Sequence, residues 1–110
     1  MTRIQIIKKN GHVSQISVLG HAGYADAGED IVCAAISVLT ISILNGLTEL
    51  VGRKDLDEKV EEGTVTFEIP RSEDELIFRE TQLLLDTYIL GIKGVEEAYG
   101  SYIKIEEVEN

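Results

Sequence analysis

GHAGYADAGEDIVC, residues 20–33, joins a glycine-rich loop to a long apolar segment, and the other predicted elements extend from this junction. The segment that follows, AAISVLTISILNGL at residues 34–47, contains no charged residue. Asp30 precedes the first apolar residue, and an aspartate at that position accepts hydrogen bonds from the free amides of a first helical turn. We therefore expect a helix that begins at Ile31 and ends just before Gly52.

The uncharged run from Ile31 to Thr48 is at the lower limit of the length that spans a bilayer. It also carries polar side chains, including Ser37 and Asn45. We interpret it as a buried central helix and expect no association with a membrane.

Two β-strands are predicted before the loop. Residues 3–9 and 13–19 are rich in alternating apolar side chains and flank Asn10-Gly11, a strong two-residue hairpin signal. The second strand ends at Gly20 and His21, so this hairpin brings His21 to one rim of the domain.

The second half of the chain predicts a hairpin, a helix and a strand. The hairpin comprises residues 57–61 and 64–69, with apolar and polar side chains alternating in its second strand. Ser72 and Glu75 have the spacing of a capping box, which predicts a helix over about 73–91 that Gly91 and Gly94 close. A last strand is expected over 101–108.

The predicted order ββαββαβ indicates an α+β fold, with a largely antiparallel sheet packed against two helices. The length of 110 residues fits a single domain, residues 1–110.

Composition restricts the classes of partner. The net charge of −10 disfavours direct binding to nucleic acid and favours a basic partner. One cysteine excludes an internal disulfide, and residues 1–20 contain no continuous apolar stretch of the kind that marks a secretory signal. We expect a cytoplasmic protein with a reduced thiol.

Cys33 falls at the third position of the predicted helix. A free thiol has a pKa near 8.5, and a helix N-terminus stabilises a thiolate by only about 0.3–1 kcal/mol. Glu29 and Asp30 add opposing negative charge, so a nucleophilic cysteine here needs a cation. His21 is the candidate, because the loop can bring it beside Cys33.

Alternatives remain open at this point. A lone cysteine before an apolar run is ordinarily a core residue. Zinc ligation by His21, Asp26, Asp30 and Cys33 lacks the several thiolates of a structural site, and the loop lacks the lysine of a phosphate-binding loop. We therefore expect no metal and no cofactor.

The motif GHA at residues 20–22, followed by a glycine-bearing loop and by DIVCAA at residues 30–35, resembles the signature of the ribosomal-processing cysteine protease family, Prp. The resemblance covers nearly the whole chain. It implies an endopeptidase in which Cys33 is the nucleophile and His21 the general base. It also implies a homodimer whose substrate is the precursor of large-subunit ribosomal protein twenty-seven, from which the enzyme removes an N-terminal extension.

The resemblance assigns supporting roles to further residues. Gly20, Asp30 and Ser37 match other motif positions, and Asp30 could cap the helix or orient His21. The loop that gates substrate entry contains Gly23, Tyr24, Asp26 and Gly28, and its glycines predict mobility unless another part of the chain docks on it. Amides at the helix N-terminus are natural oxyanion donors.

Two other classes of function stay open. One is a non-catalytic, ribosome-associated binding module with an inert buried thiol. The other is a hydrolase of small thioesters or amides.

Overall fold

The computed structural model describes residues 1–26, 29–61 and 63–110. The elements are β1 (Thr2–Lys9), β2 (His12–Leu19), α1 (Ile31–Asn45), the π-helical turn η1 (Gly46–Leu50), β3 (Asp57–Glu61), β4 (Thr64–Glu68), α2 (Glu75–Ala98) and β5 (Ile103–Glu109). This is the predicted α+β order ββαββαβ, with η1 continuing α1.

The strands form one five-stranded sheet in the order β3-β4-β2-β1-β5. β1 and β2 pair antiparallel around Asn10 and Gly11, whose φ angles of 52° and 80° suit the tight turn that Asn-Gly favours. The β2–β4 and β3–β4 pairs are also antiparallel, whereas β5 pairs with β1 in parallel. The sheet is therefore mixed, and largely antiparallel as predicted.

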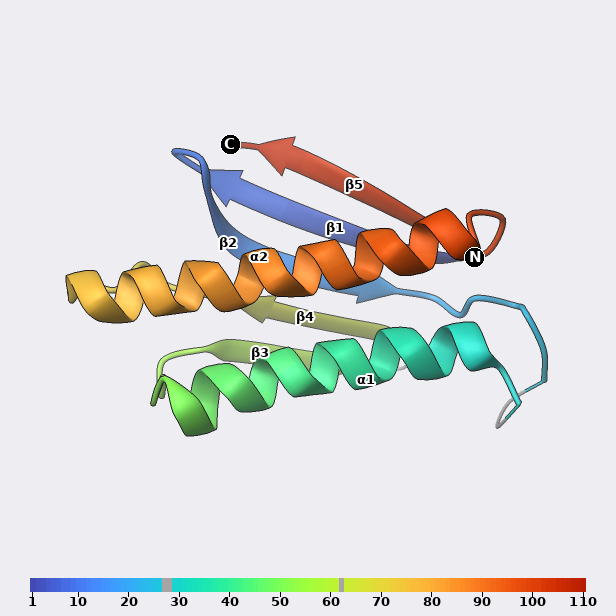
Figure 1. Ribbon diagram of the computed structural model, residues 1–110, viewed down its shortest axis with the longest axis horizontal. Helices are drawn as coiled ribbons and strands as arrows, with labels where there is room; N and C mark the ends of the chain where they lie inside the picture. Colours follow the sequence, from blue (N-terminus) through green and yellow to red (C-terminus); the bar gives the residue numbers. More distant parts are fainter. Residues whose placement is uncertain (27–28, 62) are drawn as a thin grey trace.

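Both helices lie side by side on one face of the sheet and run in opposite directions (Figure 1). The start of α1, the end of α2 and the N-terminus consequently meet at one end of the molecule. The core lies between the layers. From the sheet it takes Ile4, Ile6, Ile16, Phe67 and Ile103, and from the helices Val32, Ile36, Leu47, Leu85, Ile89 and Ile92.

α1 is less buried than the sequence led us to expect. Together α1 and η1 form the one segment, among the described residues, that is long and apolar enough to cross a membrane, and 28% of its most apolar window is buried. The core helix of a globular domain has the same length and composition, so this is weak evidence of insertion. One side of α1 packs on the sheet, while Val38 and Ile41 on another side are exposed. The prediction of a buried central helix therefore holds for one side of α1, which contributes Val32, Ile36 and Ile43 to the core, and not for the side that carries Val38 and Ile41.

α2 differs from the prediction at both ends. Its N-cap is Asp74, whose side chain accepts a hydrogen bond from the Ile77 amide, whereas the Ser72 hydroxyl accepts one from the Asp74 amide. The capping box of Ser72 and Glu75 is therefore wrong, because Asp74 is the better placed acceptor. Gly91 and Gly94 lie inside α2 rather than after it, since the buried face of the helix continues through Ile92.

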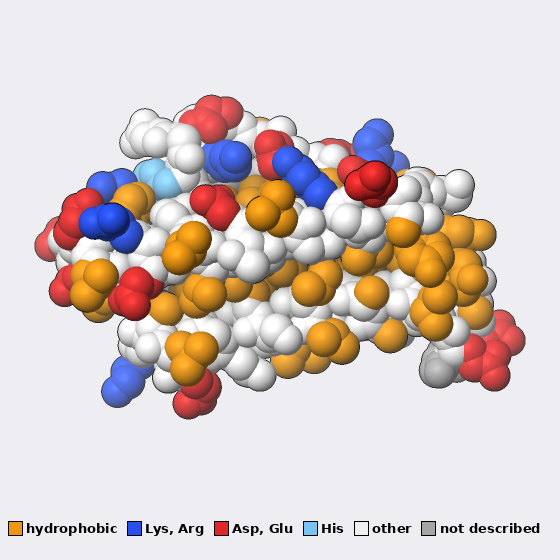
Figure 2. Space-filling view, viewed as in Figure 1, with side chains coloured by type: hydrophobic (Ala, Val, Ile, Leu, Met, Phe, Trp, Pro, Cys, Tyr) orange, Lys and Arg blue, Asp and Glu red, His pale blue; other side chains and the backbone are white. Residues whose placement is uncertain are grey.

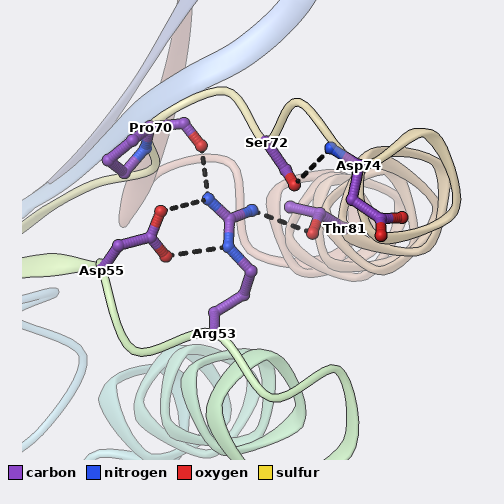
Figure 3. Close-up of polar contacts among 6 residues, drawn as sticks. All are labelled: Arg53, Asp55, Pro70, Ser72, Asp74 and Thr81. Atoms are coloured by element: carbon purple, nitrogen blue, oxygen red, sulfur yellow. Dashed lines mark hydrogen bonds and ion pairs between the residues drawn. The ribbon is translucent and has the colours of Figure 1, made fainter.

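A buried arginine joins the two halves of the chain at the other end of the molecule, where α1 ends and α2 begins (Figure 1). Figure 3 shows its contacts. The Arg53 side chain lies just after η1 and is 4% exposed. Its Nε and Nη2 atoms donate to the two carboxylate oxygens of Asp55 at 2.9 and 3.0 Å, and Nη1 donates to Thr81 Oγ1 at 3.0 Å. Nη2 also donates to the carbonyl oxygen of Pro70. The guanidinium thus links the end of η1 to α2 and to the segment before α2.

Candidate active site

The N-terminus of α1 is built around Asp30. Its Oδ1 atom accepts hydrogen bonds from the amides of Val32 at 3.0 Å and Cys33 at 2.9 Å. Asp30 is therefore the N-cap, and Cys33 occupies the third helical position, as predicted. This geometry puts the thiol in the first turn of the helix.

The second oxygen of Asp30 holds the loop. Oδ2 accepts hydrogen bonds from the amides of Tyr24 at 3.0 Å and Ala25 at 3.4 Å. The pKa of Asp30 is held below its ordinary value, chiefly by the hydrogen bond from the Cys33 amide and further by those from Ala25 and Tyr24. Of the two roles left open for Asp30, these contacts favour the helix cap, which also fastens the loop to the helix.

The Cys33 thiol is half-buried rather than enclosed in the core. The amide of Ala22 donates to Cys33 Sγ at 3.3 Å, and Ala22 itself is only 3% exposed. This hydrogen bond fixes the backbone of Ala22 beside the sulfur atom. Ala22, the residue after the motif histidine, thus contacts the thiol directly through its backbone. The sequence did not predict this contact.

His21 and Ser37 border the same space as Cys33. All three line a cavity of about 250 Å³ between α1 and the ends of β2 and β4, and all three also line a second cavity of about 480 Å³ on the loop side. His21 is exposed, and Ser37 is exposed one turn beyond Cys33. The structure therefore brings the predicted histidine, cysteine and serine to one place.

Gly20 shapes the entry to this site. Its φ angle is +80°, and a Cβ atom built there would lie 3.1 Å from the carbonyl oxygen of Met1. Its amide donates to the carbonyl oxygen of Gly63 at 2.7 Å, which fastens the end of β2 to the β3–β4 turn. Only glycine satisfies both the backbone conformation and the close approach.

The loop residues take different positions. Gly23 has a φ angle of +75°, Tyr24 packs on the end of α2, and Asp26 is exposed, with its carbonyl oxygen accepting from the Glu29 amide at 2.9 Å. Gly28 lies outside the described residues. The part of the loop from Gly20 to Ala25 is held by contacts with other segments. The sequence predicted mobility only for a loop without such contacts.

An apolar groove that the sequence did not predict extends the site along α1. A cavity of about 270 Å³ lies between α1 and the β3–β4 hairpin and shares four lining residues with the first cavity: Val18, Ile36, Ser37 and Val65. Ile41, Leu44 and Val60 line its further part. Alternation in residues 64–69 predicts that Val65 faces the helices, but nothing in the sequence predicts which strands border the thiol.

The oxyanion donors expected at the helix N-terminus have partners in this structure, because the amides of Val32 and Cys33 both donate to Asp30.

Among the described residues, no group of three or more His, Cys, Asp or Glu side chains is arranged to hold a metal ion. A helix-terminal thiol, an adjacent amide donor and an imidazole at one cavity together suit nucleophilic attack on a carbonyl group.

Comparisons with known proteins agree with this chemistry. A model of the family described as cysteine protease Prp matches residues 1–104. The chain is 28% identical over 94 residues to the ribosomal processing cysteine protease Prp of Bacillus subtilis, covering 84% of each chain. It is 29% identical over 99 residues to the protein of the same name from Staphylococcus aureus, covering 90% of this chain and 91% of the other.

Solved structures share the fold. A crystal structure of the S. aureus ribosomal processing protease Prp with a covalently linked product peptide superimposes with a TM-score of 0.87 at 24% identity, covering 97% of this chain and 99% of the other. A Streptococcus mutans protein superimposes with a TM-score of 0.80 at 27% identity, covering 100% and 96%. The S. aureus protease has also been solved with a substrate peptide, with a TM-score of 0.81, 24% identity and coverage of 97% and 99%.

Proposed function

This chain belongs to the cysteine protease Prp family and is a cysteine peptidase, and we propose that Cys33 is its nucleophile and His21 its general base. The observation that carries the assignment is the placement of both side chains on the same cavities, with the thiol in the first turn of α1. Cys33 is also the only cysteine of the chain.

The proposed reaction has two halves. His21 accepts the thiol proton, Cys33 Sγ attacks the scissile carbonyl carbon, and the proton passes to the leaving amine as the C–N bond breaks. Water then attacks the thioester with His21 as base, which releases the acid product and restores the thiol. The Ala22 amide, which donates a hydrogen bond to Sγ, holds the sulfur atom in place before the attack.

The proposed substrate is the precursor of large-subunit ribosomal protein twenty-seven, from which an N-terminal extension is removed. The curated relatives are named ribosomal processing proteases, which supports a ribosomal protein as the substrate. The strongly negative net charge of this chain suits a basic protein of that kind.

The groove along α1 is the proposed binding site for the substrate peptide. From Cys33 to Leu44 the helix rises by about 16 Å at about 1.5 Å per residue. An extended peptide advances by about 3.3 Å per residue, so the groove holds about five residues on one side of the scissile bond. Its lining suits apolar side chains, which also explains why Ile41 and Val60 are exposed in the free protein.

A homodimer in the cytoplasm completes the proposal. Apolar side chains follow both helices on the face that turns away from the sheet (Figure 2). Val38 of α1 and Leu83 and Leu90 of α2 are all more than half exposed. Light scattering should give twice the chain mass, and Leu83→Glu with Leu90→Glu should shift it toward the monomer. An unchanged dimer in that variant would place the interface elsewhere.

The proposed activity is tested by the intact mass of the precursor after incubation with this protein. We expect one discrete N-terminal loss, absent with Cys33→Ala and with His21→Ala, and retained with the matched control His12→Ala. Rapid alkylation of the Cys33 thiol without cleavage would argue for a different substrate, such as a small thioester. Slow alkylation that matches the rate of the unfolded chain would instead favour an inert binding module.

A further inference from the structure

The segment that carries His21 is held from outside the motif. Tyr24 lies three residues after His21, and its ring packs edge-to-face against Tyr99, with centroids 5.6 Å apart, and against Tyr102, at 5.1 Å. The interplanar angles of 80° and 83° are those of favourable aromatic pairs. Residues about 75 positions away in sequence therefore border the active-site loop.

The turn that bears these two rings is itself well fixed. Tyr99 ends α2, with its amide donating to the carbonyl oxygen of Val95 at 2.8 Å, and the Tyr102 amide donates to the carbonyl oxygen of Tyr99 at 2.9 Å. The carbonyl oxygen of Tyr102 in turn accepts from the amide of Thr2 at 2.9 Å, at the start of β1. Hydrophobic side chains gather at this end of the molecule, where α2 ends and α1 begins (Figures 1 and 2). The turn between α2 and β5 is therefore held by hydrogen bonds at both ends and gives Tyr24 a fixed surface to pack against.

The anchored loop meets the thiol through its backbone. Between the fixed amide of Gly20 and the Tyr24 amide on Asp30 lie His21, which borders the cavities, and Ala22, whose amide donates to Cys33 Sγ. Gly23, the residue between Ala22 and Tyr24, has a φ angle of +75°, a backbone conformation that glycine adopts readily. A displacement of Tyr24 would therefore move the imidazole and the Ala22 amide together.

We propose that Tyr24 is a positioning residue for the peptidase: its ring, seated against Tyr99 and Tyr102, holds His21 and the Ala22 amide beside the Cys33 thiol. The inference rests on the proposed roles of Cys33 and His21. It assigns to the turn between α2 and β5 a part in catalysis that the motif at residues 20–35 does not contain. Tyr24 positions the loop through its aromatic ring, and phenylalanine has the same ring without the hydroxyl group.

The test compares Tyr24→Ala, Tyr24→Phe and Tyr99→Ala with the wild type. The matched control is Phe78→Ala, which removes another edge-to-face contact, with His12 at 5.4 Å and 79°, away from the site. Four kinds of measurement are made: steady-state kinetics with a peptide substrate, which give kcat and KM, the rate of Cys33 alkylation by iodoacetamide against pH, amide exchange at Ala22 and Tyr24, and the melting temperature.

We expect Tyr24→Ala to lower kcat by about tenfold, from the loss of two aromatic contacts, with a much smaller change in KM. The rate of Cys33 alkylation in this variant should differ from that of the wild type, and the Ala22 amide should exchange faster. Tyr99→Ala should behave in the same direction, Tyr24→Phe should restore wild-type behaviour, and Phe78→Ala should change the melting temperature alone.

A Tyr24→Ala variant with the wild-type alkylation profile and wild-type exchange at Ala22 would overturn the proposal. So would a Tyr24→Phe variant as impaired as Tyr24→Ala, because the hydroxyl and not the ring would then be responsible. Alkylation and exchange do not depend on turnover. If the wild type cleaves no peptide, they still decide whether Tyr24 positions the loop, while the proposed function fails separately.

Discussion

At the scale of the residue, Asp30 shows how one side chain can serve two elements. One carboxylate oxygen caps α1 and the other accepts from the amides of Tyr24 and Ala25. Both sets of hydrogen bonds are stronger when the carboxylate is ionised. The sequence predicted the cap from the position of Asp30 before an apolar run, but the hold on the loop depends on a backbone path that no local pattern encodes.

This arrangement predicts a pH dependence of stability. Because the hydrogen bond from the Cys33 amide is the main cause that lowers the pKa of Asp30 in the folded state, folding is favoured while Asp30 is ionised. The contribution is complete above the ordinary pKa of 3.8 and is lost as pH falls through the lower folded value. Asp30→Asn keeps a neutral cap, so its melting temperature should fall less than that of the wild type between pH 6 and about pH 2.5.

Thermal unfolding followed by circular dichroism across that range measures the difference. Asp74→Asn, at the cap of α2, is the matched control for removing a carboxylate from a helix start. Parallel curves for the wild type and Asp30→Asn would contradict the assignment of a strengthened, ionised cap.

Arg53 predicts a second effect at this scale. Its guanidinium is almost fully buried and donates hydrogen bonds to Asp55, to Thr81 and to the carbonyl oxygen of Pro70. Arg53→Ala leaves these partners without a donor and should lower the free energy of unfolding by about 2–4 kcal/mol. Arg53→Lys keeps the charge but not the planar fork, so its loss should be smaller.

Urea unfolding gives these values directly. Arg3→Ala is the control, because its ion pair with Glu106 is exposed and should contribute less than about 1 kcal/mol. An Arg53→Ala variant no less stable than Arg3→Ala would show that the buried network does not stabilise the fold.

At the scale of the element, substitutions at Gly91 and Gly94 of α2 distinguish the effect of helix propensity on stability from the effect of packing against α1. Gly94 is exposed, and a Cβ atom there would meet nothing within 4 Å. Gly94→Ala should therefore raise the free energy of unfolding by about 0.5–1 kcal/mol, since alanine is the better helix former. At Gly91 the same atom would lie 3.1 Å from Leu39 Cδ2 of α1, so Gly91→Ala should gain less.

Urea unfolding of the two variants side by side makes the comparison, with the slope against urea concentration expected to stay constant. Equal gains at both positions would mean that Leu39 moves aside freely. A loss at Gly94 would contradict the extension of α2 beyond this position.

The strands and the first helix could be predicted because their signals are local. Asn10-Gly11 determines the first hairpin, and alternation in residues 64–69 marks β4. The end of α2 could not be predicted, since Gly91 and Gly94 resemble terminators while the packing of Ile92 and Val95 extends the helix. The parallel pairing of β5 with β1 is a contact between the two ends of the chain, and no local pattern specifies it.

At the scale of the whole molecule, the candidate site illustrates the same division. Cys33, His21 and Ser37 stand out by residue type and spacing in the motif, and the structure brings them to one cavity. The β3–β4 hairpin that closes this cavity and the tyrosines that hold the loop come from distant segments with no chemical signature of their own. Only the folded topology, in which the start of α1 meets the end of α2, makes them neighbours (Figure 1).

The net charge of −10 is a property of the whole molecule and predicts how fast a basic substrate arrives. Opposite charges steer association at low ionic strength, where the Debye length is about 30 Å at 0.01 M salt, and this shrinks to about 8 Å at 0.15 M. The kcat/KM for the ribosomal precursor should therefore fall by about tenfold over that range, with little change in kcat. A short uncharged peptide that spans the same cleavage site is the control and should show almost no dependence, and neither should alkylation of Cys33 by uncharged iodoacetamide. Equal salt dependence for the precursor and the uncharged peptide would contradict steering, because salt would then act on the enzyme itself and not on the encounter.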